Sequence, residues 1–193
     1  MPESQRMRTA RTSHGIPALI EKLSLIRYDI KLESFSFSRR TAVVKQMKIE
    51  GLLFDPRSNM YILLLKEISG SNTLPIWIGK PEADSIALAL GKIVTPRPLT
   101  HDLIKNVITG VNMKITKVVI TEIVDNTYYA GIYVDRGDGS EVPIDSRPSD
   151  AIAVAIRINA PIFVDESVIE HKNNDELEAW LKKLKPEDFG NIM

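Results

Sequence analysis

The stretch from residue 143 to 156 combines ionisable and hydroxyl side chains with an apolar run. Its polar half contains Asp145, Arg147, Ser149 and Asp150, and its second half is composed of small and branched apolar residues that predict a buried helix. The first turn of a helix exposes unpaired N–H groups and a partial positive charge, both of which favour an anion. The pattern therefore predicts an anion-binding site where this helix begins.

Two further groups of polar residues precede or open predicted helices. Arg97 lies shortly before His101 and Asp102 at the start of one helix, and Glu82 and Asp84 lie at the start of another. Carboxylates and imidazole can accept protons or bind metal ions, and arginine can hold a phosphate group. These types can do chemistry together only if the fold brings them to one place.

An internal repeat explains how the fold can do so. Residues 47–49 and 113–115 both read Met-Lys-Ile, and the helical stretch 80–90 is echoed by 147–156. Matching pairs are 66 to 68 residues apart, which indicates two copies of one unit rather than a long solenoid. We expect repeat A over about 47–91 and repeat B over about 113–157, related by a pseudo-twofold axis.

Each copy reads as three strands followed by a helix, because β-branched runs alternate with turn residues. The helices are expected to begin near Asp84 and Asp150, and a further helix near Thr100 as N-cap. The predicted strands are 48–54, 61–68 and 74–78 in the first copy and 117–124, 127–134 and 141–144 in the second, with a short one at 161–164. This pattern predicts an α+β fold, a single compact domain of antiparallel strands and helices.

The domain is expected to cover residues 47–170. Residues 1–46 form an N-terminal extension, expected to be poorly ordered or partly helical, and residues 171–193 a C-terminal helix and tail. The extension is Arg-rich, which is typical either of a plain tail or of an organellar transit peptide. It contributes no residue to the candidate site.

Composition limits the chemistry further. The 193 residues contain no cysteine and no run approaching the ~20 apolar residues that span a bilayer, so we expect a soluble protein without disulfides. Residues 1–46 hold nine Lys/Arg and four Asp/Glu, a net of +5, so the remaining residues carry −5. An acidic body argues against tight, non-specific binding to duplexes. Nucleotide, lipase and zinc-protease motifs are absent, and we expect no organic cofactor.

Four stretches together resemble the bifunctional nuclease domain family. They are 74–79 (Leu-Pro-Ile-Trp-Ile-Gly), 97–103 (Arg-Pro-Leu-Thr-His-Asp-Leu), 144–152 (Ile-Asp-Ser-Arg-Pro-Ser-Asp-Ala-Ile) and 160–164 (Ala-Pro-Ile-Phe-Val). The resemblance covers roughly residues 47–170. It implies a small duplicated α+β domain, frequent self-association, activity on both DNA and RNA, and a cytoplasmic setting.

Hydrolysis of a phosphodiester needs an activated water, neutralisation of charge in the transition state and support for the leaving oxygen. Carboxylates holding Mg²⁺ or Mn²⁺ can supply the first and third, and arginine the second. The candidate catalytic residues are Asp102, His101, Asp145 and Asp150; those for binding substrate phosphate are Arg97, Arg147 and Ser149; and those for binding metal are Asp145, Asp150, Glu82 and Asp84.

A structural interpretation of the same residues stays open. Asp84, Asp102 and Asp150 lie at predicted helix starts, where a carboxylate stabilises the helix by about 0.3 to 1 kcal/mol without any catalytic role. Arg97 and Arg147 precede prolines and can pair with a neighbouring aspartate. By the same reasoning His101 can donate to a backbone carbonyl, and Trp77 is expected to pack in the core or against another subunit rather than stack on a base.

Two functions follow from these interpretations. The first is a nuclease that hydrolyses DNA and RNA with low sequence preference and the help of a divalent metal ion. The alternative is a non-catalytic homo-oligomeric regulatory or interaction module that binds an anionic ligand or a protein partner around residues 147–150. In both cases we expect self-association and no contact with a membrane.

Overall fold

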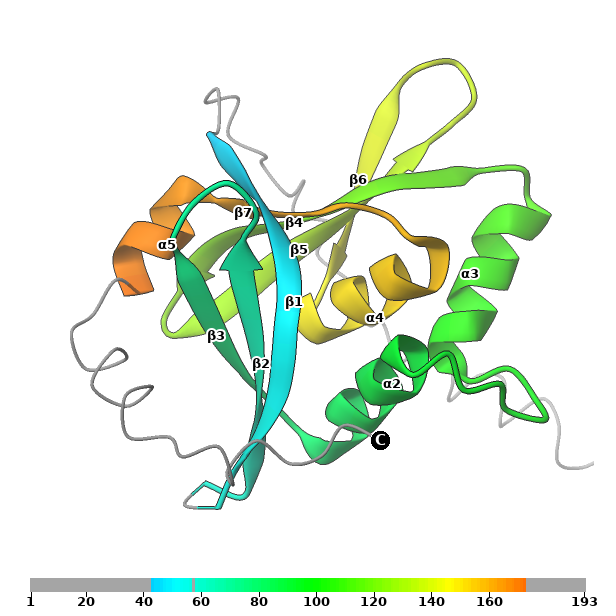
Figure 1. Cartoon of the computed structure of the whole chain (residues 1–193). Helices are drawn as coiled ribbons and strands as arrows, with labels where there is room; N and C mark the ends of the chain where they lie inside the picture. The colour runs from blue at the N-terminus through cyan, green and yellow to red at the C-terminus, as the bar shows by residue number, and fades with distance from the viewer. Residues whose placement is uncertain (1–42, 57, 173–193) are drawn as a thin grey trace, which may run out of the picture. The chain divides into compact units, whose positions relative to one another are not determined.

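The repeat in the sequence appears as two similar units in the computed structural model, which describes residues 43–56 and 58–172 (Figure 1). Each unit consists of three antiparallel strands followed by a helix. The first comprises β1 (Val44–Asp55), β2 (Met60–Glu67), β3 (Thr73–Ile78) and α2 (Lys80–Leu90). The second comprises β4 (Lys114–Val124), β5 (Thr127–Asp135), β6 (Glu141–Ser146) and α4 (Pro148–Ile158).

A short strand after the second unit joins the two into one sheet. β7 (Ile162–Asp165) lies between β1 and β4, antiparallel to the first and parallel to the second. The resulting order is β3-β2-β1-β7-β4-β5-β6, which is symmetric about β7. The predicted α+β fold with an internally duplicated unit is therefore confirmed.

The two units share a local irregularity as well as their topology. The register of β1 against β2 shifts between Ile49 and Gly51, and that of β4 against β5 shifts between Ile115 and Lys117. An extra residue at such a bulge bends the strand and increases its twist. Because Ile49 and Ile115 occupy matching places in the repeat, both first strands bend at the same point.

Turn chemistry fixes the hairpin of the second unit. Val124 pairs with Thr127, which leaves Asp125 and Asn126 as a two-residue turn with φ values of 49° and 60°. Positive φ at both positions defines the turn type whose twist matches that of paired strands, and Asp and Asn tolerate it better than most residues. The turn predicted at these two residues is therefore present.

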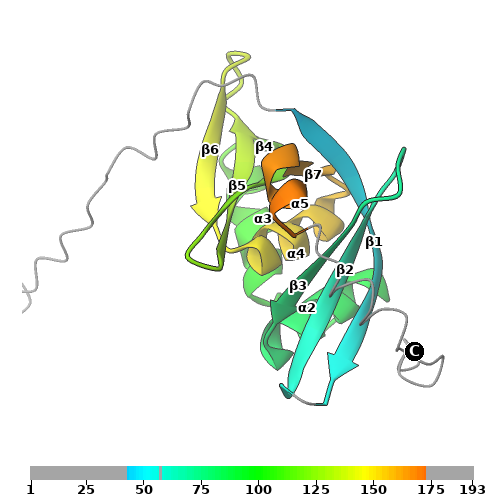
Figure 2. The ribbon, with the colours of Figure 1, turned by 90° about the vertical axis from the view of Figure 1, so that its left-hand side faces the viewer.

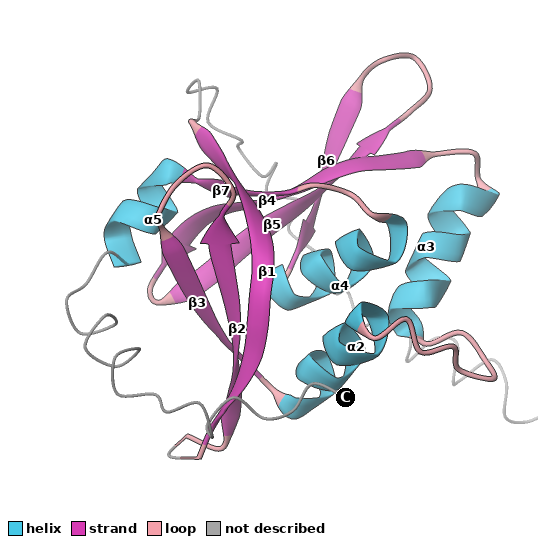
Figure 3. Cartoon of the chain, viewed as in Figure 1, coloured by secondary structure: helices cyan, strands magenta, loops and turns pink. Residues whose placement is uncertain are grey.

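Three helices pack side by side (Figure 3). The central helix, α4, contacts both α2 and α3 (Thr100–Gly110). The alanines of α4 are almost fully buried, and their small size allows close approach of its neighbours; they are Ala151, Ala153 and Ala155. The short helix α5 (Glu166–Lys172) packs against β3, β4 and β7 instead.

Several predicted boundaries were wrong. α2 begins at Lys80 rather than near Asp84, because Pro81 fits the first turn, where its missing N–H costs no hydrogen bond. Thr100 is the first residue of α3, whose N-cap is Leu99. β6 runs through to Ser146, two residues beyond the predicted end.

Other expectations concern parts of the chain beyond the description. The C-terminal helix and most of the N-terminal extension lie outside the described residues. None of the helices in the described part has both the length and the apolarity needed to cross a bilayer.

The sheet bends strongly enough to bring distant strands together. Tyr128 on β5 donates a hydrogen bond from its hydroxyl to the carbonyl oxygen of Pro75 on β3, at 3.2 Å. Five steps separate these strands in the sheet order, which in a flat sheet would place them about 24 Å apart. Figure 2 shows the strands of the two units on either side, with α5 in front between them.

Substituting Tyr128 by Phe tests this contact. Loss of the bond is expected to lower the free energy of unfolding at pH 8 by about 1 kcal/mol. Burial raises the pKa of Tyr128 to about 12 from 10.0, so the stability that its neutral form contributes is complete below pH 10 and is lost as pH rises toward 12. Urea unfolding at pH 8 and pH 11 should therefore show a smaller loss of stability with pH in the variant than in the wild type.

The control for this substitution is Tyr61→Phe, which removes a phenolic hydroxyl from the first unit. It is expected to change the free energy of unfolding by less than about 0.5 kcal/mol. Equal stability of Tyr128→Phe and the wild type at pH 8 would mean that the hydroxyl does not hold the two units together.

Candidate active site

An ion-pair cluster joins the first turns of α2 and α4. The side chain of Arg147, the N-cap residue of α4, donates from Nε to Asp150 Oδ2 at 2.7 Å and from Nη2 to Asp150 Oδ1 at 3.1 Å. Its third nitrogen, Nη1, donates to Glu82 Oε1 at 3.0 Å. Because Glu82 belongs to repeat A and Arg147 to repeat B, the helix starts of the two copies meet at this arginine.

His101 continues the cluster onto α3. Its Nε2 lies 3.1 Å from Asp150 Oδ1, and its Nδ1 lies 2.8 Å from the hydroxyl oxygen of Ser85 on α2. An ionised carboxylate only accepts hydrogen bonds, so the proton of a neutral His101 must be on Nε2. Nδ1 is then the acceptor, and Ser85 donates its hydroxyl proton to it.

Ser85, His101 and Asp150 form a hydrogen-bonded series, which we call the relay. Arg157 lies behind it and connects α2, α3 and α4. Its Nη2 donates to the carbonyl oxygen of Ser85 at 3.2 Å and to the hydroxyl oxygen of Ser85 at 3.3 Å. Its Nε donates to Asp102 Oδ1 at 2.7 Å, and its Nη1 donates to the carbonyl oxygen of Ala153 at 2.8 Å. The Arg157 side chain is only 7% exposed, so these acceptors replace the water it loses.

The contacts in this cluster shift the pKa values of its ionisable groups. Burial opposes ionisation of Asp150, but the hydrogen bonds from Arg147 and His101 outweigh it and lower the pKa of this carboxyl. Burial likewise opposes ionisation of Asp102, whose pKa is nevertheless lowered by the Leu99 N–H and by Arg157. Hydrogen bonding to Asp150 raises the pKa of Arg147. Both carboxyls are therefore carboxylates at neutral pH.

The arrangement can move a proton. His101 Nδ1 can take the hydroxyl proton of Ser85, the Asp150 carboxylate stabilises the resulting imidazolium, and Arg157 donates to the same Ser85 oxygen as negative charge develops on it. Arg147 is 66% exposed, and within the described residues only three of its five N–H groups have partners. Two N–H groups are thus available to an anion from solvent.

The fold brings together some of the predicted site residues and not others. Glu82, His101, Arg147 and Asp150 form one network, and Asp102 joins it through Arg157. In the second turn of α2, Asp84 pairs with Lys80 on the exposed side. The remaining three, in the described part of the chain, make no side-chain hydrogen bond: they are Asp145 and Arg97, both exposed, and Ser149, which is buried.

Asp145 lies apart from the network because of the strand that carries it. It is the fifth residue of β6, opposite Gly131 of β5, and it is exposed. Asp150 is instead the third residue of α4. The strand end and the helix start therefore carry these two carboxylates on different elements.

The candidate metal ligands do not gather around one point. Nowhere in the described residues do three carboxylate or imidazole groups come together closely enough to hold one cation. Asp150 and Glu82 share Arg147, and Asp84 holds Lys80. As placed, these residues do not fit a Mg²⁺ or Mn²⁺ site, so we derive no chemical step through a metal ion.

Sequence reasoning missed Ser85 and Arg157. Both lie inside helical runs whose apolar spacing predicts a buried face, where a serine or an arginine attracts little notice. One signal was available for Arg157, because a charged residue in an otherwise apolar helix needs a partner when it is buried. No comparable signal marks Ser85, whose role depends on the residue that faces it from α3.

The fold and the network together define a duplicated α+β domain whose polar site lies where the helices of its two halves meet. A family model described as the bifunctional nuclease domain matches residues 63–176. The chain belongs to the bifunctional nuclease domain family.

Similar proteins come from bacteria and plants. An uncharacterized protein of Mycobacterium tuberculosis (strain ATCC 25618 / H37Rv) is 38% identical over 163 residues, which are 75% of this chain and 97% of that protein. Bifunctional nuclease 1 of Oryza sativa subsp. japonica is 31% identical over 111 residues, 56% of this chain and 34% of that protein. Bifunctional nuclease 2 of Arabidopsis thaliana is 30% identical over 107 residues, 54% of this chain and 32% of that protein. The chain thus matches about a third of each plant nuclease.

Proposed function

We propose that this protein hydrolyses phosphodiester bonds of DNA and RNA with low sequence preference. Membership of the bifunctional nuclease domain family supports the substrate class. The observation that carries the proposal is the hydrogen-bonded series Ser85–His101–Asp150, with Arg147 bound to the same aspartate. An imidazole, a hydroxyl and a guanidinium able to bind phosphate therefore lie within one network.

In the first chemical step, the proton moves along this series, from the Ser85 hydroxyl to His101. The Ser85 hydroxyl oxygen attacks phosphorus while its proton passes to His101 Nδ1, and a bond from phosphorus to Ser85 forms. The bond from phosphorus to the leaving sugar oxygen breaks, and His101 returns the proton to that oxygen. Asp150 keeps the imidazole in the tautomer that the step requires.

The second step restores the protein. A water molecule attacks phosphorus in the serine–nucleotide phosphodiester left by the first step and gives its proton to His101; the bond from phosphorus to Ser85 breaks, and the serine oxygen takes the proton back. Arg147 binds the non-bridging oxygens through N–H groups that do not contact Glu82 or Asp150. Because it recognises phosphate rather than bases, low sequence preference follows.

Divalent metal dependence is proposed separately. Mg²⁺ or Mn²⁺ can enter with the substrate phosphate, since such ions are commonly held by one or two carboxylates together with phosphate oxygens. Of the four candidate carboxylates, Asp145 makes no side-chain hydrogen bond within the described residues, whereas Glu82 and Asp150 would first have to leave Arg147, and Asp84 would have to leave Lys80. Metal dependence is tested by measuring nucleic acid cleavage with Mg²⁺, with Mn²⁺ and with a chelator.

The decisive experiment is cleavage of labelled single- and double-stranded DNA and RNA by the full chain. Ser85→Ala and Asp150→Asn are expected to lose at least about 100-fold in rate, since each breaks the relay. The matched controls are Ser58→Ala and Asp138→Asn, both in exposed turns, which should cut at the wild-type rate. Equal cleavage by all five identically purified proteins would assign the activity to a contaminant, and absence of cleavage in every metal arm would exclude the nuclease.

A non-catalytic, homo-oligomeric interaction module is the second candidate function. This function is favoured by exposed apolar side chains on and next to α3. They are Leu103 and Val107 within the helix and Val111, its C-cap residue. Apolar side chains grouped on one exposed helix are common at protein interfaces. Sedimentation equilibrium, run on proteins that show no cleavage, distinguishes the two: a stable oligomer without nuclease activity supports the module.

A further inference from the structure

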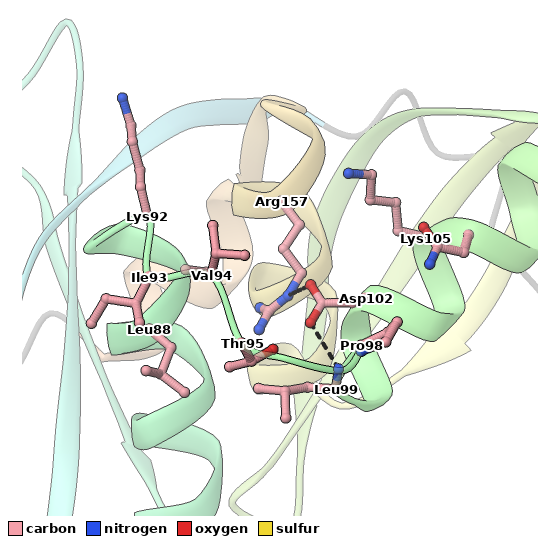
Figure 4. A pocket seen from close by; sticks show the side chains of 12 residues that line it. Leu88, Lys92, Ile93, Val94, Thr95, Pro98, Leu99, Asp102, Lys105 and Arg157 are labelled. Carbon is pink, nitrogen blue, oxygen red and sulfur yellow. Dashed lines mark hydrogen bonds and ion pairs between the residues drawn. The ribbon is translucent and has the colours of Figure 1, made fainter.

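A cavity of about 500 Å³ lies beside the relay, between the end of α2, the connection to α3, and α3 itself (Figure 4). This volume is within the range of sites for small organic ligands. Asp102 and Arg157 line the cavity, and no side chain of the Ser85–His101–Asp150 relay does. The cavity is therefore a separate space that contacts the network through one ion pair.

The lining of this cavity has an apolar part and a cationic part. Leu88, Ile93 and Leu99 supply apolar surface, and Lys92 and Lys105 supply ammonium groups. Within the described residues neither lysine forms an ion pair, whereas Asp102 and Arg157 neutralise each other. The lining thus carries a net charge of about +2 by this count of its ionic side chains.

The two lysines come from different elements. Lys92 follows the end of α2 and Lys105 belongs to α3, and in Figure 4 their side chains lie on opposite sides of the opening. Asn106, also in the lining, offers an amide that both donates and accepts hydrogen bonds. The complementary ligand is a small molecule with an apolar ring, hydrogen-bonding edges and a dianionic group.

We propose that this cavity binds a nucleoside monophosphate, with the base against Leu88, Ile93 and Leu99 and the phosphate at the opening, where the flexible side chains of Lys92 and Lys105 can reach it from opposite sides. The choice of a nucleotide rests on the proposed function, because phosphodiester hydrolysis releases nucleotide ends beside the cavity. Occupancy also bears on the relay, since Arg157 contacts the cavity on one side and the Ser85 hydroxyl on the other.

The test is isothermal titration of the full chain with AMP in the presence of a chelator. AMP contains no phosphodiester, so cleavage does not enter the measurement. Adenosine and inorganic phosphate serve as separate probes, and each is expected to bind at least tenfold more weakly than AMP because each reaches only one part of the cavity. Phosphate binding as tight as AMP binding would overturn the nucleotide assignment.

Variants locate the binding. The double substitution Lys92→Ala and Lys105→Ala is expected to weaken the binding of AMP at least tenfold, because it removes charge-assisted contacts to the phosphate. Ile93→Ser should weaken AMP and adenosine while leaving inorganic phosphate unchanged, and Lys114→Ala, an exposed lysine outside the cavity, should change nothing. Wild-type affinity in the double variant, or no heat with AMP at millimolar concentration, would overturn the proposal.

Failure of this proposal and failure of the proposed nuclease give different results. AMP binding that depends on Lys92 and Lys105 in a protein without cleavage would leave the cavity assigned and the nuclease rejected. Cleavage that depends on Ser85 in a protein that does not bind AMP would give the opposite result.

Discussion

Replacing His101 by glutamine is expected to lower kcat/KM for nucleic acid cleavage by about 10²- to 10⁴-fold. The glutamine amide can donate to Asp150 and its carbonyl can accept from Ser85, so the two contacts that position His101 can be kept. Glutamine does not take up a proton, however. The substitution therefore removes the chemistry of the imidazole while preserving its packing.

The measurement is the initial rate on one labelled single strand, with urea unfolding to verify that the variant folds. The matched control is His171→Gln on α5, which is exposed and should cut at the wild-type rate. A folded His101→Gln protein with unchanged kcat/KM would remove His101 from the mechanism. Loss of cleavage in both histidine variants would indicate a general effect on the preparation.

The second large effect concerns stability. Substituting Asp102 by Ala is expected to lower the free energy of unfolding by about 3 kcal/mol, because it leaves the Arg157 guanidinium buried without its anionic partner. Asp102 is itself 32% exposed, so we expect a loss at the low end of the range typical for breaking a buried ion pair. It also removes the acceptor for the Leu99 N–H at the start of α3, where a carboxylate stabilises the helix.

The pH dependence of this effect has a defined sign. The pKa of Asp102 is lowered from its ordinary 3.8, so its contribution is complete above that pH and is lost as pH falls through the lower, folded-state pKa. The difference between wild type and Asp102→Ala should therefore be largest at pH 7 and shrink below pH 3.8. Urea unfolding at pH 7 and pH 3 measures it.

A double-mutant cycle separates the buried charge from the lost contact. Combining Asp102→Ala with Arg157→Met removes both charges and should be more stable than Asp102→Ala alone. The control Glu50→Ala removes an exposed carboxylate that pairs with Lys48 and should cost less than about 1 kcal/mol. If the double variant is no more stable than the single one, Arg157 is not an uncompensated charge in Asp102→Ala.

Much of the fold was predictable because its information is local and occurs twice. Strand-like runs of residues and the turn at Asp125 and Asn126 predicted the hairpins, and the repeated Met-Lys-Ile predicted the two units. The place of β7 was not predictable, because a four-residue strand does not specify its neighbours. Its pairing with β1 and β4 depends on contacts between residues far apart in the chain.

The candidate site was predicted in part for the same reason. Residue type and helix position identified Glu82, His101, Arg147 and Asp150, which meet in the structure. Their partners were not identified, since the pairing of His101 with Ser85 depends on how α2 and α3 pack. Residue type alone also did not separate Asp150 from Asp145, because their difference lies in the elements that carry them.

The central position of β7 has a consequence for folding kinetics. Among the described strands, the one that joins the two halves is the last to leave the ribosome, so β1 and β4 keep one unpaired edge until residues 162–165 are available. Pairing Met47 with Ile162 closes a very long loop, and such non-local contacts slow folding. During synthesis each half therefore exposes a strand edge to other chains, and β7 ends that exposure for both halves in one event.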